Sequence, residues 1–224
     1  DGLSKKYNTR YFTFSDEAVS PHSLSDVSDQ IIERRLDVRA LALLRFEKKM
    51  DEPLFEKMRK AGFTFLLFGL ESANNRILSL MQKGASKETA RDVLQKSRKA
   101  GIWNHLFLFF GFPTETREEA METIEFLKEN SENIHSFVPG VFILYRDSPI
   151  HHHPDRFSVT RVFELPDTDI SMYLGFEVSS GMPIHLAKEA NDLCIKIGEE
   201  IFPSINIWGE MPREHFLLYL DRYG

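Results

Sequence analysis

The stretch FTFLLFGLES, from Phe63 to Ser72, joins a nearly unbroken apolar run to a polar end. Continuous rather than alternating hydrophobicity is typical of a strand covered on both faces, as in a parallel sheet. Helical patterns precede it at 51–62 and follow it at 74–81 and 86–101. We therefore expect a β-strand flanked by helices, with Glu71 and Ser72 at its carboxyl end.

The same strand–helix unit recurs along the chain. Further strands are expected at 10–17, 38–47, 103–113 and 136–145, and further helices at 23–36 and 116–130. Helix N-caps are expected at Ser20, Asp51, Ser86 and Thr116. The alternation predicts an α/β fold, a partial (βα) TIM-like barrel of parallel strands, because five units are too few to close eight strands. A doubly wound open sheet is the alternative.

Beyond Tyr145 the strand–helix rhythm stops. Residues 146–169 contain three prolines and read as a long irregular stretch, and helices are expected at 184–202 and 213–224. The chain is thus divided into a partial barrel over residues 1–147 and a C-terminal irregular and mainly helical extension over 148–224.

Composition excludes several classes of protein. The net charge of −6 makes nucleic acid an improbable main partner, because phosphate binding requires a basic face. No apolar run approaches the roughly 20 residues that span a bilayer, so no membrane partner is expected. The single cysteine, Cys194, excludes an internal disulfide and favours a reducing compartment, so we expect a cytoplasmic protein. Because the chain starts at Asp1 rather than methionine, we expect it to be processed or a piece of a longer protein.

Polar residues stand at the carboxyl end of every expected strand, where parallel α/β folds bind ligands. A rim rich in carboxylates suits hydroxyls and amines, such as a ribose or an α-amino group, and an arginine among them suits a carboxylate or phosphate. The competing interpretation is that these side chains cap the following helices. The strand-end residues are Ser15, Asp16, Glu17, Arg45, Glu47, Gly69, Glu71, Ser72, Gly111, Pro113, Glu115, Tyr145, Arg146 and Asp147.

Two segments carry a resemblance to a known family. FGLESANNRILSLMQKG (68–84), followed by AGIWNHLFLFFGFPTETREEAMETIEFL (100–127), resembles the second half of the radical S-adenosylmethionine (SAM) barrel. The resemblance is to the subclass often fused to cobalamin-binding domains and extends over roughly residues 10–159. It implies an enzyme in which a four-iron, four-sulfur cluster reduces SAM, and the resulting deoxyadenosyl radical abstracts hydrogen from an organic substrate.

The resemblance also implies roles for residues on the first three expected strands. Glu71 and Ser72 would lie against SAM, with Glu71 reaching the ribose hydroxyls or the methionyl amine. Asp16 and Glu17 stand where the family contacts the methionyl amine, although the usual Gly-Gly-Glu is not present. Arg45 would lie near the sulfonium or the carboxylate.

On the last two strands the resemblance implies contacts with the adenine and the substrate. Gly111, Phe112 and Pro113 would line the adenine, and Tyr145 would face a small-molecule or peptide substrate. No catalytic residue is assigned within this chain.

The family's cluster loop, CxxxCxxC, is missing. Thiolates are the required ligands, and Cys194 in an expected late helix reads as core packing. We therefore expect the 4Fe-4S cluster only in the full-length protein, with the loop upstream of Asp1. A divergent relative that lost the cluster is the alternative.

The histidines are not expected to bind a metal. The HHH run at 151–153 lies between Pro149 and Pro154 and is expected to be an extended, solvated loop rather than a metal site. His105 alternates with apolar residues and is expected to be a core or barrel-lining histidine rather than a catalytic one.

The sequence thus predicts a fragment of a radical SAM enzyme that supplies part of the SAM- and substrate-binding barrel and is inactive alone. The alternatives are a cluster-free α/β ligand-binding or scaffold domain and, ranked last, a hydrolase or isomerase barrel using Glu71. An incomplete barrel exposes the edge of its first strand, which predicts a homodimer paired across that edge.

Overall fold

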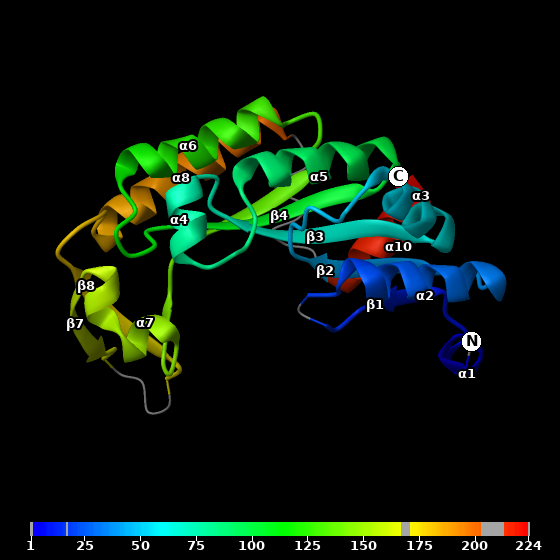
Figure 1. The fold of residues 1–224 in the computed structure, drawn as a ribbon, viewed down its shortest axis with the longest axis horizontal. Coiled ribbons are helices and arrows are strands. Elements are labelled where there is room, and N and C mark those ends of the chain that lie inside the picture. Colours follow the sequence, from blue (N-terminus) through cyan, green and yellow to red (C-terminus); the bar gives the residue numbers. More distant parts are fainter. Residues whose placement is uncertain (1, 17, 167–170, 203–212, 224) are drawn as a thin grey trace.

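The computed structural model describes residues 2–16, 18–166, 171–202 and 213–223, and its centre is a five-stranded parallel sheet (Figure 1). The strands are β1 (Tyr11–Thr13), β2 (Arg39–Leu44), β3 (Phe63–Glu71), β4 (Trp103–Phe110) and β5 (Ser136–Val141). They lie side by side in chain order, each parallel to the next. In a doubly wound sheet the strand order would reverse at a switch point, whereas here it follows the chain, so the predicted partial (βα) barrel is confirmed.

Helices connect the strands and begin where the capping residues predict. They are α1 (Gly2–Tyr7), α2 (Pro21–Glu33), α3 (Glu52–Ala61), α4 (Asn75–Leu80), α5 (Lys87–Lys99), α6 (Arg117–Glu129), α8 (Ile184–Ile201) and α10 (Arg213–Tyr223). The side chains of Ser20, Asp51, Ser86 and Thr116 each accept a hydrogen bond from the backbone N–H of the residue three positions later. Helix α1 was not expected, because its six residues carry no buried face.

The main core lies between the sheet and the helices on its outer face. Leu66 and Phe68 of β3 pack in one cluster with Phe55 of α3, Leu94 of α5 and Ile124 of α6. Figure 1 shows α5, α6 and α8 together on this side of the sheet. The continuous apolar runs of the strands are thereby explained, since the alternate residues are buried on the opposite face.

Helix α10 covers the opposite, inner face near the starts of the strands. Phe216 packs on Phe65, with ring centroids 5.1 Å apart, and lies close to His105. His105 is buried, and its Nδ1 lies 2.8 Å from the hydroxyl of Ser136. The expectation of a core histidine is confirmed.

A second sheet, which is antiparallel, follows the barrel strands. It contains β6 (Leu144–Tyr145), β8 (Tyr173–Val178) and β7 (Val159–Glu164), in that spatial order. Along the chain, α7 (Pro149–His152) and the 3₁₀ helix η1 (Pro154–Phe157) lie between β6 and β7. The expectation of an irregular stretch here is wrong. Its short strands are stabilised by pairing with each other and by a shared apolar cluster with Phe112, so local pattern alone does not reveal them.

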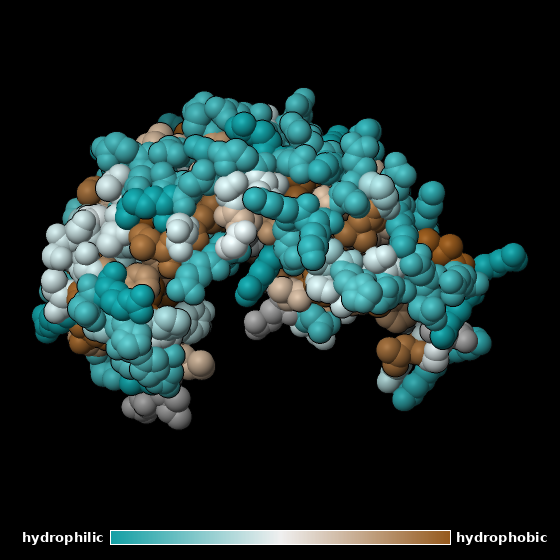
Figure 2. Space-filling view, in the orientation of Figure 1, coloured by the Kyte–Doolittle hydropathy of each residue, from teal (hydrophilic) through white to brown (hydrophobic). Residues whose placement is uncertain are grey.

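The space-filling view shows the molecule as an arch, hollowed between the antiparallel sheet at one end and α1 at the other (Figure 2). Within the residues that the structure describes, no helix combines the length and the apolar character needed to cross a bilayer.

Candidate functional site

Glu71 ends β3 in a left-handed conformation with φ of 63°, where the register with β4 is irregular. Its Oε1 lies 2.7 Å from Nζ of Lys83, which comes from the connection between α4 and α5. A Cβ on Gly69 would lie only 2.8 Å from the same oxygen, so the carboxylate folds over a position where an added side chain would displace it. The glycine, glutamate and lysine of this motif therefore form one structural unit.

Both members of this ion pair remain partly exposed, with 18% of the Glu71 side chain and 28% of the Lys83 side chain accessible. Lys83 was not selected from the sequence. The signal that could have identified it is the KG that closes the same quoted motif, but a spacing of twelve residues does not by itself place an amine on a carboxylate.

Ser72 lies behind Glu71 rather than beside it. Its hydroxyl is fully buried, lies 3.4 Å from Thr123 Oγ1 of α6, and accepts a hydrogen bond from the backbone N–H of Asn74. The left-handed backbone of Glu71 directs its side chain toward Lys83, whereas Ser72 is buried against α6, so the two do not share one ligand surface in this conformation. The hydroxyl instead fixes the start of α4.

The turn after β4 is held by a buried carboxyl group. Gly111 adopts φ of 83°, and its N–H donates to Glu115 Oε2 at 2.7 Å. Burial raises the pKa of Glu115 to about 7, although the hydrogen bond from Gly111 opposes this shift. Glu115 Oε1 is also buried and has no hydrogen-bond partner among the described residues. Gly111, Phe112 and Pro113 are buried around this turn.

Arg76 of α4 joins the two motifs. Its Nη2 donates to the backbone oxygen of Thr114 at 2.8 Å, and its Nε donates to Glu119 of α6 at 2.6 Å. The turn after β4 is thus tied to the helix that follows Glu71, and the two strand ends are held in a fixed relation.

An apolar pocket of about 300 Å³ lies beside these strand ends. Phe112 and Phe142 form part of its wall in edge-to-face contact, and Tyr145 contributes an exposed ring. Leu80, Met81 and Gln82 also line it and lead directly into Lys83. Phe112 and Tyr145 therefore line one pocket. The Glu71–Lys83 pair is connected to it through residues 80–82, which line the pocket and directly precede Lys83.

The remaining strand-end residues stand apart from this group. Asp16 and Arg45 are exposed beyond β1 and β2, and no hydrogen bond or ion pair joins either to another described residue. Glu17 lies outside the described residues. The first two strands thus contribute open charged groups, whereas the third to fifth contribute the built part of the site.

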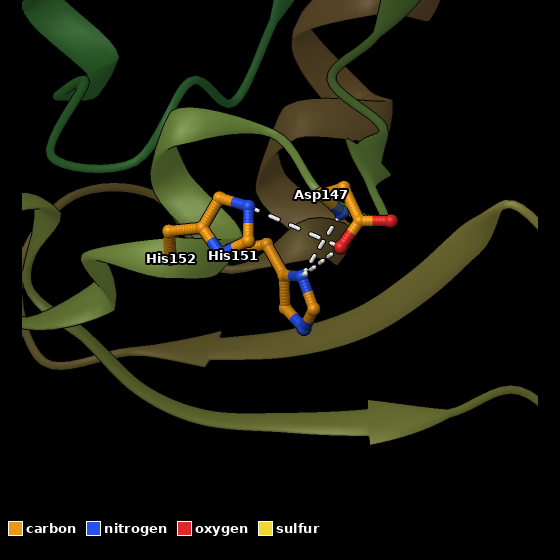
Figure 3. Close-up of side chains that lie close together, drawn as sticks. All are labelled: Asp147, His151 and His152. Carbon is orange, nitrogen blue, oxygen red and sulfur yellow. Dashed lines mark hydrogen bonds and ion pairs between the residues drawn. The ribbon is translucent and has the colours of Figure 1, made fainter.

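His151 and His152 form the second half of the short helix α7, and His153 follows its end, so the expectation of an extended loop is wrong (Figure 3). Pro149 occupies the first helical turn, where its missing N–H costs nothing. Asp147 Oδ1 lies 4.0 Å from His151 Nδ1 and 3.9 Å from His152 Nε2. His151 Nδ1 accepts the backbone N–H of Asp147 at 3.0 Å, so that lone pair is already in use. This hydrogen bond holds the His151 ring beside Asp147.

The residues of this chain do not fit an iron–sulfur cluster. Cys194 lies within α8 and is only 1% exposed, and burial raises its pKa to about 12. A cluster requires several accessible thiolates. The expected packing role of Cys194 is confirmed, and the thiol is not available as a cluster ligand.

Strands in consecutive parallel order, helices outside them and a polar and apolar site at the strand ends define a partial (βα) barrel. The sequence profile of the Radical SAM superfamily matches residues 5–127, more than half of the chain. The chain belongs to the radical SAM superfamily.

Two sequence relatives carry names that describe a reaction. The chain is 30% identical over 129 residues to an uncharacterized methyltransferase of Pyrococcus horikoshii, covering 57% of this chain and 28% of the relative. It is 26% identical over 78 residues to a putative methylthiotransferase of Methanocaldococcus jannaschii, covering 35% of this chain and 17% of that protein. The chain thus spans less than a third of the curated relatives that it matches.

Solved structures share the fold at low identity. The radical SAM methyltransferase TsrM of Kitasatospora setae, with cobalamin and a [4Fe-4S] cluster bound, aligns with a TM-score of 0.59 and 16% identity, covering 67% of this chain and 29% of that one. Coproporphyrinogen III oxidase (HemN) of Escherichia coli aligns with a TM-score of 0.56 and 14% identity, covering 86% and 40%.

Proposed function

We propose that this chain supplies part of the SAM- and substrate-binding barrel of a larger radical SAM enzyme. The observation that carries the proposal is the Glu71–Lys83 ion pair, folded over Gly69 at a strand end, on the same segment as residues 80–82, which line an apolar pocket. The methyltransferase and methylthiotransferase names of its relatives favour transfer of a small group as the reaction of the whole protein.

The chemistry of SAM matches this arrangement in two parts. The methionyl end carries an ammonium and a carboxylate, and Glu71 and Lys83 offer one opposite charge to each. The adenine ring is flat and mostly apolar at its faces, which suits a pocket walled by Phe112 and Phe142. Binding would require the ion pair to open, and its partial exposure permits this at low cost because exposed pairs contribute about 0–1 kcal/mol.

The other strand-end residues assist binding without forming the ion pair. Asp16, Glu17 and Arg45 contribute charge on the side of the first two strands, and Tyr145 faces the substrate. Ser72 supports Glu71 from behind through its contact with Thr123. When bound, the cluster supplies the electron that makes SAM reactive, and residues outside this chain hold it.

The proposal is tested by titrating the chain with SAM in a calorimeter. Binding is expected to be weak, because the family's cluster normally holds the methionyl group. Glu71→Gln and Lys83→Met should each abolish the heat signal, while adenosine should still compete for the pocket. Glu199→Gln, which removes an exposed carboxylate in α8, is the matched control and should bind like the unmodified chain.

Two outcomes separate the proposal from its alternatives. Binding of SAM that is unchanged in Glu71→Gln would refute the assigned site. Failure of both SAM and adenosine to bind, with the fold intact by circular dichroism, would favour the cluster-free scaffold.

The proposed substrate of the whole protein is a small molecule or a peptide, and the proposed partner is a second copy of this chain. β1 is an edge strand of the described parallel sheet, and pairing of two copies across that edge would satisfy its free backbone groups. A monodisperse monomer in solution scattering would contradict this pairing.

A further inference from the structure

A second pocket, of about 430 Å³, lies at the opposite end of the parallel sheet, where the strands begin. Arg39 and Trp103 are the first residues of β2 and β4, and His135 directly precedes β5. Arg59 and Arg98 reach the pocket from the last turns of α3 and α5. The pocket is therefore separate from the site at the carboxyl ends of the strands.

Among the described residues that line this pocket, Asp221 is the one carboxylate, and it is already neutralised. Asp221 of α10 accepts hydrogen bonds from Arg10, from Arg39 Nε at 3.1 Å and from the hydroxyl of Tyr11 at 2.9 Å. The hydrogen bonds from Arg10 and Tyr11 are the main reason that the pKa of Asp221 is lowered. Its negative charge is thus balanced without the two helix-borne arginines.

Arg59 and Arg98 have no carboxylate partner within the described part of the chain. A basic residue near a helix C-terminus is favoured by the helix dipole, which explains a positive charge at each position. It does not explain why two guanidinium groups line the same pocket. Lys99, the neighbour of Arg98, shows the ordinary arrangement, because it forms an ion pair with Glu52 at 2.9 Å.

The contact between Arg98 and His135 identifies what the pocket lacks. His135 Nδ1 accepts the backbone N–H of Asn104 at 3.0 Å, so a neutral ring carries its proton on Nε2. Burial, and then the charge of Arg98, lower the pKa of His135 to about 4, which keeps the ring neutral at physiological pH. Arg98 Nη1 nevertheless lies 2.7 Å from Nε2. Two donors thus face each other with no acceptor between them.

We propose that this pocket binds a tetrahedral oxyanion of the phosphate type, carried by a small phosphomonoester, between Arg98, His135 and Arg59. An anion oxygen placed against the Arg98 and His135 N–H groups supplies the acceptor that both lack. A dianion balances the two unpaired guanidinium charges, and planar guanidinium groups match phosphate geometry. A volume of about 430 Å³ leaves room for the organic part of a monoester beside its phosphoryl group.

The test is calorimetric titration of the whole chain at low salt with inorganic phosphate and with glycerol 3-phosphate. Arg98→Gln and Arg59→Gln should each weaken binding about tenfold or more, the usual cost of losing a charge-assisted hydrogen bond. Lys60→Gln is the matched control, because Lys60 is an exposed residue of the same helical turn that does not line the pocket. It should leave binding unchanged. Arg59 and Arg98 are both exposed, so their variants should fold.

Several outcomes decide the proposal. Stronger binding of glycerol 3-phosphate than of inorganic phosphate supports a phosphomonoester, and equal affinities support free phosphate as the source of the oxyanion. Absence of binding by both, or an equal loss in Lys60→Gln, would overturn the site. Nitrogen NMR of His135 gives an independent check, since a proton found on Nδ1 would remove the donor–donor contact. Unchanged SAM titration in Arg98→Gln would show that the two sites are independent.

Discussion

Replacement of Glu115 by glutamine should remove a large pH dependence of stability. The carboxyl is fully buried behind the turn at Gly111, whose N–H donates to Oε2, while Oε1 has no hydrogen-bond partner in the described region. Burial is the main cause that raises its pKa from 4.5 to about 7. Glutamine has nearly the same shape and keeps an oxygen for Gly111, but it does not titrate.

The magnitude follows from the difference in proton affinity between the folded and unfolded chain. Below pH 4.5 both states hold the proton, and above pH 7 neither does. Between these values only the folded chain holds it, so the free energy of unfolding falls as the pH rises. At about 1.4 kcal/mol per tenfold change in proton affinity, a shift from 4.5 to about 7 corresponds to a loss of about 3 kcal/mol.

The assay is urea unfolding of the unmodified chain and of Glu115→Gln at pH values from below 4.5 to above 7. The free energy of the unmodified chain minus that of the variant should fall by about 3 kcal/mol across this range and then stay level. Glu199→Gln, which changes an exposed carboxylate, should run parallel to the unmodified chain. A constant difference for Glu115→Gln, or one that grows with pH, would refute the buried-carboxyl explanation.

Three further substitutions test other parts of the structure. Asn104→Ala removes three buried side-chain hydrogen bonds and should cost about 3 kcal/mol of unfolding free energy, measured by the urea midpoint. Gly69→Ala places a Cβ 2.8 Å from Glu71 Oε1, so the chain should fold while SAM titration weakens as in Glu71→Gln; normal binding would contradict the unit of Gly69 and Glu71. Gly62→Ala forces a Cβ to 1.9 Å from the oxygen of Val38 at φ of 99°, and should lower the melting temperature by an amount corresponding to at least about 2 kcal/mol.

Elements specified by interactions between nearby residues could be predicted from the sequence, whereas elements that depend on distant segments could not. Strand β3 and helix α6 were predicted because their apolar spacing and caps, such as Thr116, act within a few residues. The antiparallel sheet was missed because Val159–Glu164 becomes a strand only when it meets Tyr173–Val178. A pairing between two short segments leaves little trace in either one alone.

The candidate site divides in the same way. The sequence identified Glu71 and Phe112 through strand ends and motif, but it treated Ser72 as an equal partner of Glu71. The structure separates them, because a bulge and a left-handed residue turn one side chain toward Lys83 and bury the next against Thr123. Side-chain direction at a strand end depends on such local irregularity, which residue identity does not specify.

The sequence by itself determined the class of fold, the order of its βα units and the strand ends that carry polar groups. Only the tertiary structure decided which of those groups meet, and it also brought Arg98 to His135 and α10 to the inner face of the sheet. The physical reason is range. Periodicity and capping are set by neighbours along the chain, whereas long-range ion pairs, pockets and hydrogen bonds depend on segments that only folding brings together.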